Sequence, residues 1–263
     1  MYYSQSTLQG GSRLDSPRRP APLVSIIAVV FQSFVELRAL LDSFRSCDLS
    51  DAEIIVIDGG STDGSIDLLQ ASNDLIGFWM SEPDQGIYDA MNKGIQAAHG
   101  TYILHLNAGD TLLHLPLNAL RQCLKDRIDV ASFSVLDDNV RVFHPRSGLR
   151  NRIENTWHHQ GTFYRREAHL LYDPSYRVYG DFDLNQRMLL AGCSVRFFSE
   201  IVASHSTGGI SSALTINSAH RREIWRTVSR NSGLLYVPIA FLKLHLYILL
   251  HRFRAFRKNT DIT

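Results

Sequence analysis

Two apolar runs with a helical pattern between them constrain the fold of this chain more than any other feature. Val24–Val30 and Ile54–Ile57 are rich in β-branched residues, with one polar side chain in the first run and none in the second. Such runs are typical of strands buried on both faces of a parallel sheet. Between them, apolar residues recur at helical spacing: Phe34, Leu37, Leu40, Leu41 and Phe44. A strand, a helix and a parallel strand form a right-handed crossover, so we predict an α/β fold with Phe31 and Asp58 side by side at the carboxyl edge of the sheet.

The segment from Phe78 to Thr111 repeats this alternation and ends in polar residues. Phe78–Met80 is expected to be a strand that stops at the turn-forming residues 82–86, and a helical pattern then runs from Ile87 to Ala98. Residues 102–106 form the next expected strand, which leads directly into Asn107-Ala108-Gly109-Asp110. Open α/β sheets bind ligands just beyond the carboxyl ends of their strands, so we expect this tetrapeptide to face a ligand.

Asn107 and Asp110 suggest the binding of a metal ion and a diphosphate. Hard divalent cations take oxygen ligands, and Mg²⁺ is usually held by one or two carboxylates together with substrate phosphates. The small residues Ala108 and Gly109 would let a diphosphate approach the backbone. Asn, Gly and Asp are also ordinary turn residues, and the tetrapeptide by itself favours a strand-ending turn.

The order of the motifs carries more information than any one of them. Asp58-Gly59-Gly60-Ser61-Thr62-Asp63-Gly64 is followed by the 82–94 segment EPDQGIYDAMNKG and then by Asn107–Asp110. This order resembles the family-two glycosyltransferases of the GT-A fold, over roughly residues 24–212, and within them the bacterial enzymes of capsule and exopolysaccharide synthesis, such as the colanic acid glycosyltransferases. The resemblance implies a Rossmann-like mixed sheet flanked by helices. It also implies inverting transfer of a sugar from a nucleotide diphosphate donor, with a divalent metal, Mn²⁺ or Mg²⁺.

One departure from the family pattern leaves alternatives open. The usual metal motif is D-x-D, whereas here Asn107 stands at the first acidic position and Asp110 is the only carboxylate. An inactive relative that binds nucleotide or glycan is therefore one alternative. A sugar nucleotidyltransferase is another, although the Gly-rich basic loop that such enzymes carry after the first strand is missing at residues 31–34.

The first half of the chain supplies the predicted nucleotide pocket. Asp58 could accept hydrogen bonds from a base, and the glycines after it would leave room for that base. The alternative for Asp58 is a cap of the helix expected near residue 62. By resemblance, the pocket is completed by Asp84, Tyr88 and Asn92, with Phe31 at its edge.

The second half supplies the predicted acceptor side. The stretch from Thr156 to Arg166 is similar to a family motif near the donor sugar and acceptor, which makes His159 and Gln160 candidates, although a histidine here could equally be structural. Inverting transfer needs a carboxylate to deprotonate the acceptor hydroxyl. Aligned on the family's E-D-x-D-L pattern, Asp181 takes this role and Gly180 replaces the glutamate. The alternative for Asp181 is a helix N-cap.

His205 is the second predicted metal ligand. It precedes Gly208-Gly209-Ile210-Ser211, which resembles the family's G-G-x-S loop that closes over the donor diphosphate. A histidine before this loop can ligate metal in related enzymes, and a further ligand would compensate for Asn107. The alternative is a structural histidine at a strand end whose hydrogen bonds are made within the protein. We also expect residues 195–203 to form a pair of strands.

The ends of the chain differ from its centre. Residues 1–22 lack an apolar run and are expected to be a disordered leader, residues 23–230 the catalytic domain, and residues 231–263 an amphipathic basic helix and tail. The run from Leu234 to Leu250 is interrupted by Pro238 and Lys243, so it is too short and too charged for a membrane span. Four basic residues follow it: Arg252, Arg254, Arg257 and Lys258. They favour a helix lying on an anionic membrane surface, and the alternative is a helix packed on the domain.

We expect a cytoplasmic protein that lies peripherally on the inner face of the plasma membrane, the membrane contact being inferred from the C-terminal helix. Three widely spaced cysteines favour reduced thiols. A net charge of +1 gives no global reason to expect nucleic acid as a partner. The partners that we expect are a nucleotide-sugar donor, a lipid-linked glycan acceptor and the anionic membrane.

Overall fold

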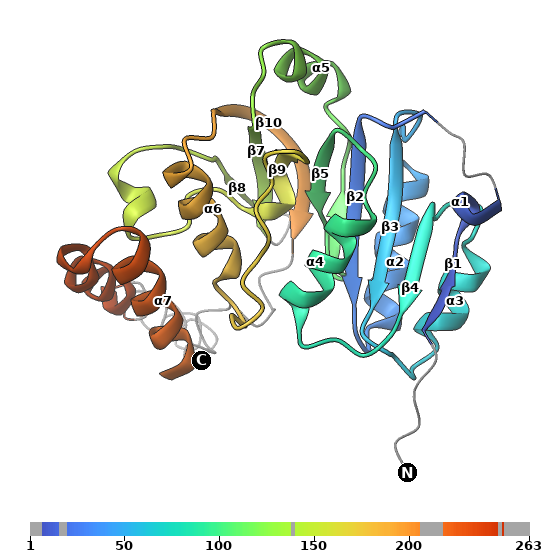
Figure 1. Ribbon diagram of the computed structural model, residues 1–263, viewed down its shortest axis with the longest axis horizontal. Coiled ribbons are helices and arrows are strands. Elements are labelled where there is room, and N and C mark those ends of the chain that lie inside the picture. The colour runs from blue at the N-terminus through green and yellow to red at the C-terminus, as the bar shows by residue number, and fades with distance from the viewer. Residues whose placement is uncertain (1–6, 16–19, 138–139, 206–217, 247–248, 250–263) are drawn as a thin grey trace, which may run out of the picture.

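The computed structural model describes residues 7–15, 20–137, 140–205, 218–246 and 249. A single ten-stranded sheet runs through the molecule (Figure 1). In chain order its strands are β1 (Leu8–Gly10), β2 (Val24–Val30), β3 (Ala52–Asp58), β4 (Phe78–Ser81), β5 (Tyr102–His105), β6 (Asp110–Leu112), β7 (Val130–Asp137), β8 (Arg141–Phe143), β9 (Thr162–Arg165) and β10 (Val195–His205). Their spatial order is β1-β4-β3-β2-β5-β9-β7-β10-β6, with β8 paired to β7.

The sheet is parallel on one side and mixed on the other. Strands β4, β3, β2 and β5 are parallel neighbours, β9 is antiparallel to both β5 and β7, and β10 is parallel to β7. The predicted Rossmann-like mixed sheet is confirmed. Residues 195–205 form one strand rather than the expected pair, and its register against β7 shifts between Phe197 and Ala203.

Helices cover both faces of the sheet. They are α1 (Ser12–Asp15), α2 (Phe34–Arg45), α3 (Ser65–Ala71), α4 (Ile87–Ala97), α5 (Leu117–Lys125), α6 (Gly180–Leu190) and α7 (Ser218–Asn231), with short 3-10 turns at Leu149–Arg152, His159–Gly161 and Leu234–Tyr236. Helices α2 and α3 lie against one face, and α4 and α6 lie against the other (Figure 1).

The central strands explain why both faces are apolar. In β2, Ile26 and Ala28 pack toward α2, whereas Ile27 and Val29 pack toward α4. Successive side chains of a strand point to opposite faces, so a run without polar alternation fills both layers. Val30 pairs with Asp58 in the β2–β3 ladder. Phe31 and Asp58 therefore reach the same edge of the sheet, as predicted.

Part of the leader is ordered, which corrects the expectation for residues 8–15. Strand β1 pairs antiparallel with β4, so that β4 is not an open edge strand. Arg13 of α1 pairs with Glu53 at 3.1 Å and lies over the ring of Phe78. Backbone pairing and a few polar contacts hold this segment in place. Such interactions need no periodic pattern of apolar residues, so they leave no sign in the sequence.

The C-terminal part forms a helical layer beside α6. Ile224 and Val228 of α7 pack with Phe182 of α6 and with Ala240, which lies in a helix over residues 237–246. Within the described part of the chain, no helix is both long enough and apolar enough to cross a membrane. The basic residues from Arg252 to Lys258 and the segment 206–217 lie outside the described residues.

Candidate functional site

Three loops meet at the carboxyl edge of the parallel strands. Phe31 follows β2, Gly59 follows β3 and Asp84 follows β4. A Cβ atom on Gly59 would lie 2.6 Å from Asp84 Oδ2 and 3.1 Å from a ring carbon of Phe31, so only glycine fits between these two side chains. The ring of Phe31 is 61% exposed. An exposed aromatic face beside a half-buried carboxylate forms a surface on which a planar base could stack and donate hydrogen bonds.

The carboxylate of Asp58 is turned into the protein. Oδ2 accepts hydrogen bonds from the Gly60 amide at 3.1 Å, the Ser61 amide at 2.9 Å and the Ser81 hydroxyl at 2.6 Å, and Oδ1 accepts one from the Ser61 hydroxyl at 2.5 Å. The residue is fully buried, and it does not cap α3, whose N-cap position is Gly64. Asp58 therefore holds the loop that faces the pocket, and direct contact with a base stays a prediction.

Tyr88 and Asn92 of α4 contact other parts of the protein rather than the pocket edge. The Tyr88 hydroxyl donates to the Val178 carbonyl at 2.7 Å and accepts from the Gly180 amide at 2.9 Å. The Asn92 side chain pairs with both backbone groups of Tyr172, at 2.9 and 2.8 Å. These contacts tie α4 to the segment before α6. A role of either residue in nucleotide binding stays a prediction.

Five of the predicted residues form a connected series of contacts. Asp181 Oδ2 lies 3.4 Å from His159 Nδ1, and His159 Nε2 lies 3.4 Å from Asn107 Nδ2. The backbone N–H of Asn107 donates a hydrogen bond to Asp110 Oδ2 at 2.8 Å. Gln160 donates to Asp110 Oδ1 at 3.3 Å. The fold thus brings together residues from the end of β5, the turn before β9 and the start of α6.

The Asn107–Asp110 segment combines a turn with an electrostatically unusual carboxylate. Asp110 begins β6, and its amide donates to the Asn107 carbonyl at 2.9 Å, so the turn alternative holds for the backbone. Burial raises the pKa of Asp110, although the nearby His159 and the Asn107 amide oppose this rise. The Oδ1 atom of Asn107 is buried and has no hydrogen-bond partner among the residues that the structure describes. A buried acceptor without a donor is costly, and a bound cation would remove that cost.

Asp181 lies in the first turn of α6, where Tyr179 rather than Asp181 has the N-cap position. Its Oδ2 also accepts from Asn155 at 2.8 Å, and Oδ1 accepts from the Phe182 amide at 2.8 Å. The side chain remains 16% exposed. Asn155 was not predicted, because an isolated Asn in a polar loop gives no local signal.

Gly180 is explained by its neighbour. A Cβ atom at this position would lie 2.6 Å from two ring carbons of Tyr88. The glutamate of the family pattern could not be accommodated unless Tyr88 moved, so the departure at Gly180 follows from the packing of α4 against α6.

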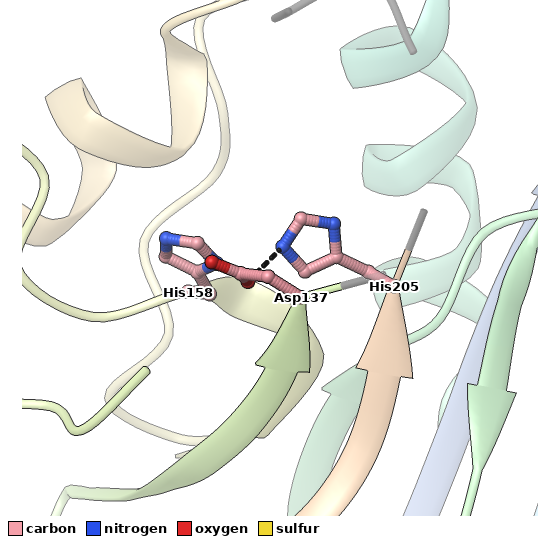
Figure 2. A group of neighbouring side chains, drawn as sticks. All are labelled: Asp137, His158 and His205. Carbon is pink, nitrogen blue, oxygen red and sulfur yellow. Dashed lines mark ion pairs between the residues drawn. The ribbon is translucent and has the colours of Figure 1, made fainter. Parts of the chain in front are cut away.

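His205 belongs to a second cluster at the ends of β7 and β10. Its Nε2 atom lies 2.8 Å from Asp137 Oδ1, and its ring centroid lies 5.1 Å from that of His158 (Figure 2). One ligand atom from each of the three residues lies within 4.8 Å of the other two, so this group could hold a metal ion. The sequence analysis missed Asp137 and His158. The sequence did contain a signal for Asp137, because this carboxylate stands at the end of a buried strand.

The electrostatics of this cluster follow from burial and mutual proximity. Burial and the neighbouring His205 lower the pKa of His158 to about 4. Burial raises the pKa of Asp137, but the hydrogen bond from His205 and the nearby His158 outweigh it, so the net shift is downward. Both shifts favour a neutral imidazole beside an ionised carboxylate, which are the protonation states that ligate metals.

Comparison with known proteins identifies the family. The sequence model described as "Glycosyl transferase family 2" matches residues 25–190. The chain belongs to this family. A "PGL/p-HBAD biosynthesis glycosyltransferase" of Mycobacterium bovis (strain BCG / Pasteur 1173P2) is 31% identical over 207 residues, which cover 74% of this chain and 81% of the relative. The protein is therefore a glycosyltransferase, as the order of its motifs predicts.

Solved structures share the GT-A fold. S. aureus TarS 1–349 in complex with UDP-GlcNAc superimposes with a TM-score of 0.62 at 15% identity, over 80% of this chain and 67% of that one. This chain also matches the structure of the same fragment in complex with UDP, where the match covers 64% of the fragment. The mannosyltransferase PcManGT from Pyrobaculum calidifontis, in complex with GDP-Man and Mn²⁺, gives a TM-score of 0.59 at 14% identity, over 90% of this chain and 76% of that one.

Proposed function

We propose that this family-two enzyme transfers a sugar, with inversion, from a nucleotide diphosphate donor to a lipid-linked glycan of a cell-surface polysaccharide. The observation that carries the proposal is the series of contacts from Asp181 through His159 and Asn107 to Asp110. It connects a partly exposed carboxylate to an acidic strand end where a donor diphosphate would lie. Neighbouring folds that bind UDP-GlcNAc or GDP-Man support a nucleotide-sugar as donor.

The donor pocket is assigned to the edge formed by Phe31, Gly59 and Asp84. Phe31 would stack on the base, and Asp84 would accept a hydrogen bond from it. Asp58 would act indirectly, because its carboxylate holds the 59–61 loop in place. The identity of the base and of the sugar is left to experiment.

The residues present fit a divalent cation. Asp110 supplies a carboxylate, and Asn107 supplies a buried oxygen without a hydrogen-bond partner within the described part of the chain. His205 pairs with Asp110 in the β6–β10 ladder. We assign the ion to Asp110 and His205. When bound, such an ion would neutralise the charge of the nucleoside diphosphate as it leaves.

Asp181 is the proposed general base. Its Oδ2 atom would take the proton of the acceptor hydroxyl as that oxygen attacks the anomeric carbon from the face opposite the leaving nucleotide. Asn155 and His159 contact the same oxygen and fix its position. Gln160 lies beside Asp110 and would orient the donor sugar or the acceptor.

The C-terminal helix supports an acceptor held at a membrane. Ile239, Leu242 and Leu246 are exposed and are spaced by three and four positions, which places them on one side of the helix over residues 237–246. Leu235, in the 3-10 turn before this helix, is also exposed. Together with the basic residues that follow in the sequence, they would contact an anionic leaflet on the cytoplasmic side. The name of the Mycobacterium bovis relative also refers to a biosynthetic pathway.

The test is a donor screen combined with Asp181→Asn. Calorimetry with UDP-, GDP- and dTDP-sugars in the presence of Mn²⁺ identifies the donor, and Asp181→Asn should keep its affinity. Transfer should fall by roughly 10²- to 10⁴-fold, the usual effect of losing a positioned general base. Asp67→Asn is the matched control, because Asp67 lies in the first turn of α3 and is exposed. If Asp181→Asn turns over within a few-fold of the wild type, Asp181 is not the base. Donor binding without any transfer by the wild type would instead support an inactive relative.

A further inference from the structure

Strand register places three ionisable side chains in one row. His205 is the partner of Asp110 in the antiparallel β10–β6 ladder and of Asp137 in the parallel β10–β7 ladder. Residues directly opposite one another in neighbouring strands project from the same face of the sheet. Asp110, His205 and Asp137 therefore lie side by side across three strand ends, with His205 in the middle.

A loop brings a fourth residue to one end of this row. His158 precedes the 3-10 turn His159–Gly161, and its ring stacks on Phe143 of β8 with the centroids 4.0 Å apart. Its backbone carbonyl accepts from the Thr162 hydroxyl at 2.7 Å, which fixes the turn against β9. The ring of His158 is thus held toward Asp137 and His205 by packing and by hydrogen bonds (Figure 2).

We propose that Asp137 and His158 join His205 as ligands of one divalent ion, the ion assigned above to His205 and Asp110, with Asp110 next to this group in the row. Two ligands of one ion with bond lengths of about 2.1 Å are separated by about 3.0 to 3.4 Å in octahedral or tetrahedral geometry. His205 Nε2 and Asp137 Oδ1 are already 2.8 Å apart, and all three ligand atoms lie within 4.8 Å of one another. Small side-chain rotations would bring the set to coordination distance.

The ligand types select the class of ion. Two imidazole nitrogens and one carboxylate oxygen suit transition metals from Mn²⁺ to Zn²⁺, whereas Mg²⁺ prefers oxygen ligands and near-ideal octahedral geometry. Three protein ligands also leave coordination positions for other oxygens. The donor diphosphate would take those positions, and this part of the inference rests on the proposed function. Binding of the ion alone is independent of the proposed function.

The experiment measures ion binding to the full chain without donor. Purified apoprotein is titrated with Co²⁺ and followed by visible absorption, and with Mn²⁺ and Mg²⁺ by calorimetry. The wild type should bind Co²⁺ and Mn²⁺ at least tenfold more tightly than Mg²⁺. Asp137→Asn and His158→Gln should each weaken Co²⁺ and Mn²⁺ binding at least tenfold. His114→Gln is the matched control, because His114 pairs with Glu200 at 2.8 Å but belongs to no three-residue group that could hold metal in the described part of the chain.

Two outcomes would overturn the proposal. Either both Asp137→Asn and His158→Gln bind Co²⁺ and Mn²⁺ as the wild type does, or the wild type prefers Mg²⁺. Thermal unfolding of each variant is measured alongside, and the two substitutions are judged separately, so that a folding defect in one leaves the other as a test. Failure of the proposed function is distinguishable, since it would leave ion binding intact while the wild type with ion and donor transfers no sugar.

Discussion

At the scale of single residues, Asp58 illustrates how a pocket residue can act without touching the ligand. Its carboxylate is surrounded by donors from the loop after β3 and from the end of β4: the Gly60 and Ser61 amides, and the Ser61 and Ser81 hydroxyls. Hydrogen bonds to a charged group contribute about 1.5–3 kcal/mol each, and a donor left buried without an acceptor costs about 1–3 kcal/mol. The carboxylate therefore contributes to the stability of the loop that shapes the pocket.

Asp58→Asn should lower both stability and donor affinity. The amide nitrogen cannot accept hydrogen bonds, so the donors facing one oxygen lose their acceptor. We expect the free energy of unfolding to fall by roughly 2–4 kcal/mol, measured by urea denaturation, with a weaker donor Kd in calorimetry. Asp74→Asn, at an exposed position, is the control. A loss of donor affinity at unchanged stability would show that Asp58 contacts the base directly.

At the scale of elements, α7 positions the segment that leads into α6. Both carboxylate oxygens of Glu223 accept from consecutive backbone amides: Arg177 at 2.7 Å, and Val178 and Tyr179 at 3.0 Å each. On the other side of this segment, the Tyr88 hydroxyl contacts Val178 and Gly180. Asp181 follows directly. The backbone position of Asp181, the proposed base, is thus fixed by α4, which precedes it in the sequence, and by α7, which follows it.

Glu223→Gln should reduce transfer more than it reduces donor binding. Glutamine offers one acceptor oxygen in place of two, so at least one of the three amides loses its partner. We expect kcat to fall by about tenfold with an unchanged donor Kd, since a small displacement of a catalytic group is costly. Arg222→Gln, an exposed neighbour on α7, is the control. An equal loss in both quantities would mean that α7 acts only through stability.

Local sequence patterns predicted individual strands and helices well, but they predicted poorly which strands lie next to one another in the sheet. The strands at Val24–Val30 and Ile54–Ile57 could be predicted because their side chains fill two apolar layers at once. Strand β1 could not, because it is held by backbone pairing with β4. The grouping of Asp137 and His158 with His205 depends on β10 lying beside β7, a long-range pairing that no local pattern contains. The sequence therefore named one member of that cluster and missed two.

At the scale of the whole molecule, a buried histidine makes stability depend on pH. Burial lowers the pKa of His169 to about 4, the Leu170 carbonyl opposes this shift, and Arg187 adds to it. Unfolded histidine titrates near 6.5, so between about pH 6.5 and 4 the unfolded state binds more protons. The contribution of this group to stability is complete above pH 6.5 and is lost as the pH falls toward 4.

His169→Gln should flatten the acid side of the stability profile. The histidine contributes up to about 3 kcal/mol over this window, at 1.36 kcal/mol per pKa unit. The measurement is the free energy of unfolding from urea titrations at pH 7, 6, 5 and 4, and the quantity compared is its slope with pH. Val35→Ser, at a position that is 70% exposed and carries no titratable group, should leave the slope as in the wild type. A His169→Gln slope equal to that of the wild type would contradict the prediction.

The C-terminal helix has two apolar sides, and the described residues of the domain cover one of them. Val237, Ala240 and Leu244 pack with Phe182 and Ile224. Leu242 on the other side is 73% exposed, and Leu235 in the 3-10 turn before the helix is 88% exposed. The two sequence alternatives are therefore compatible, because the helix can pack on the domain and still present leucines to a membrane.

Leu235→Ser combined with Leu242→Ser should weaken binding to anionic vesicles without unfolding the protein. Burying a leucine side chain contributes about 1.5–3 kcal/mol, and each basic residue near an anionic surface about 1 kcal/mol. We expect at least a tenfold loss in co-sedimentation with phosphatidylglycerol vesicles, and little binding of the wild type to neutral vesicles. Changing Arg252, Arg254, Arg257 and Lys258 to Gln should remove most of the salt dependence of binding. Val35→Ser on α2, at a position 70% exposed, is the control. If the wild type ignores anionic vesicles, the exposed leucines meet a different partner and the lipid-linked acceptor loses this support.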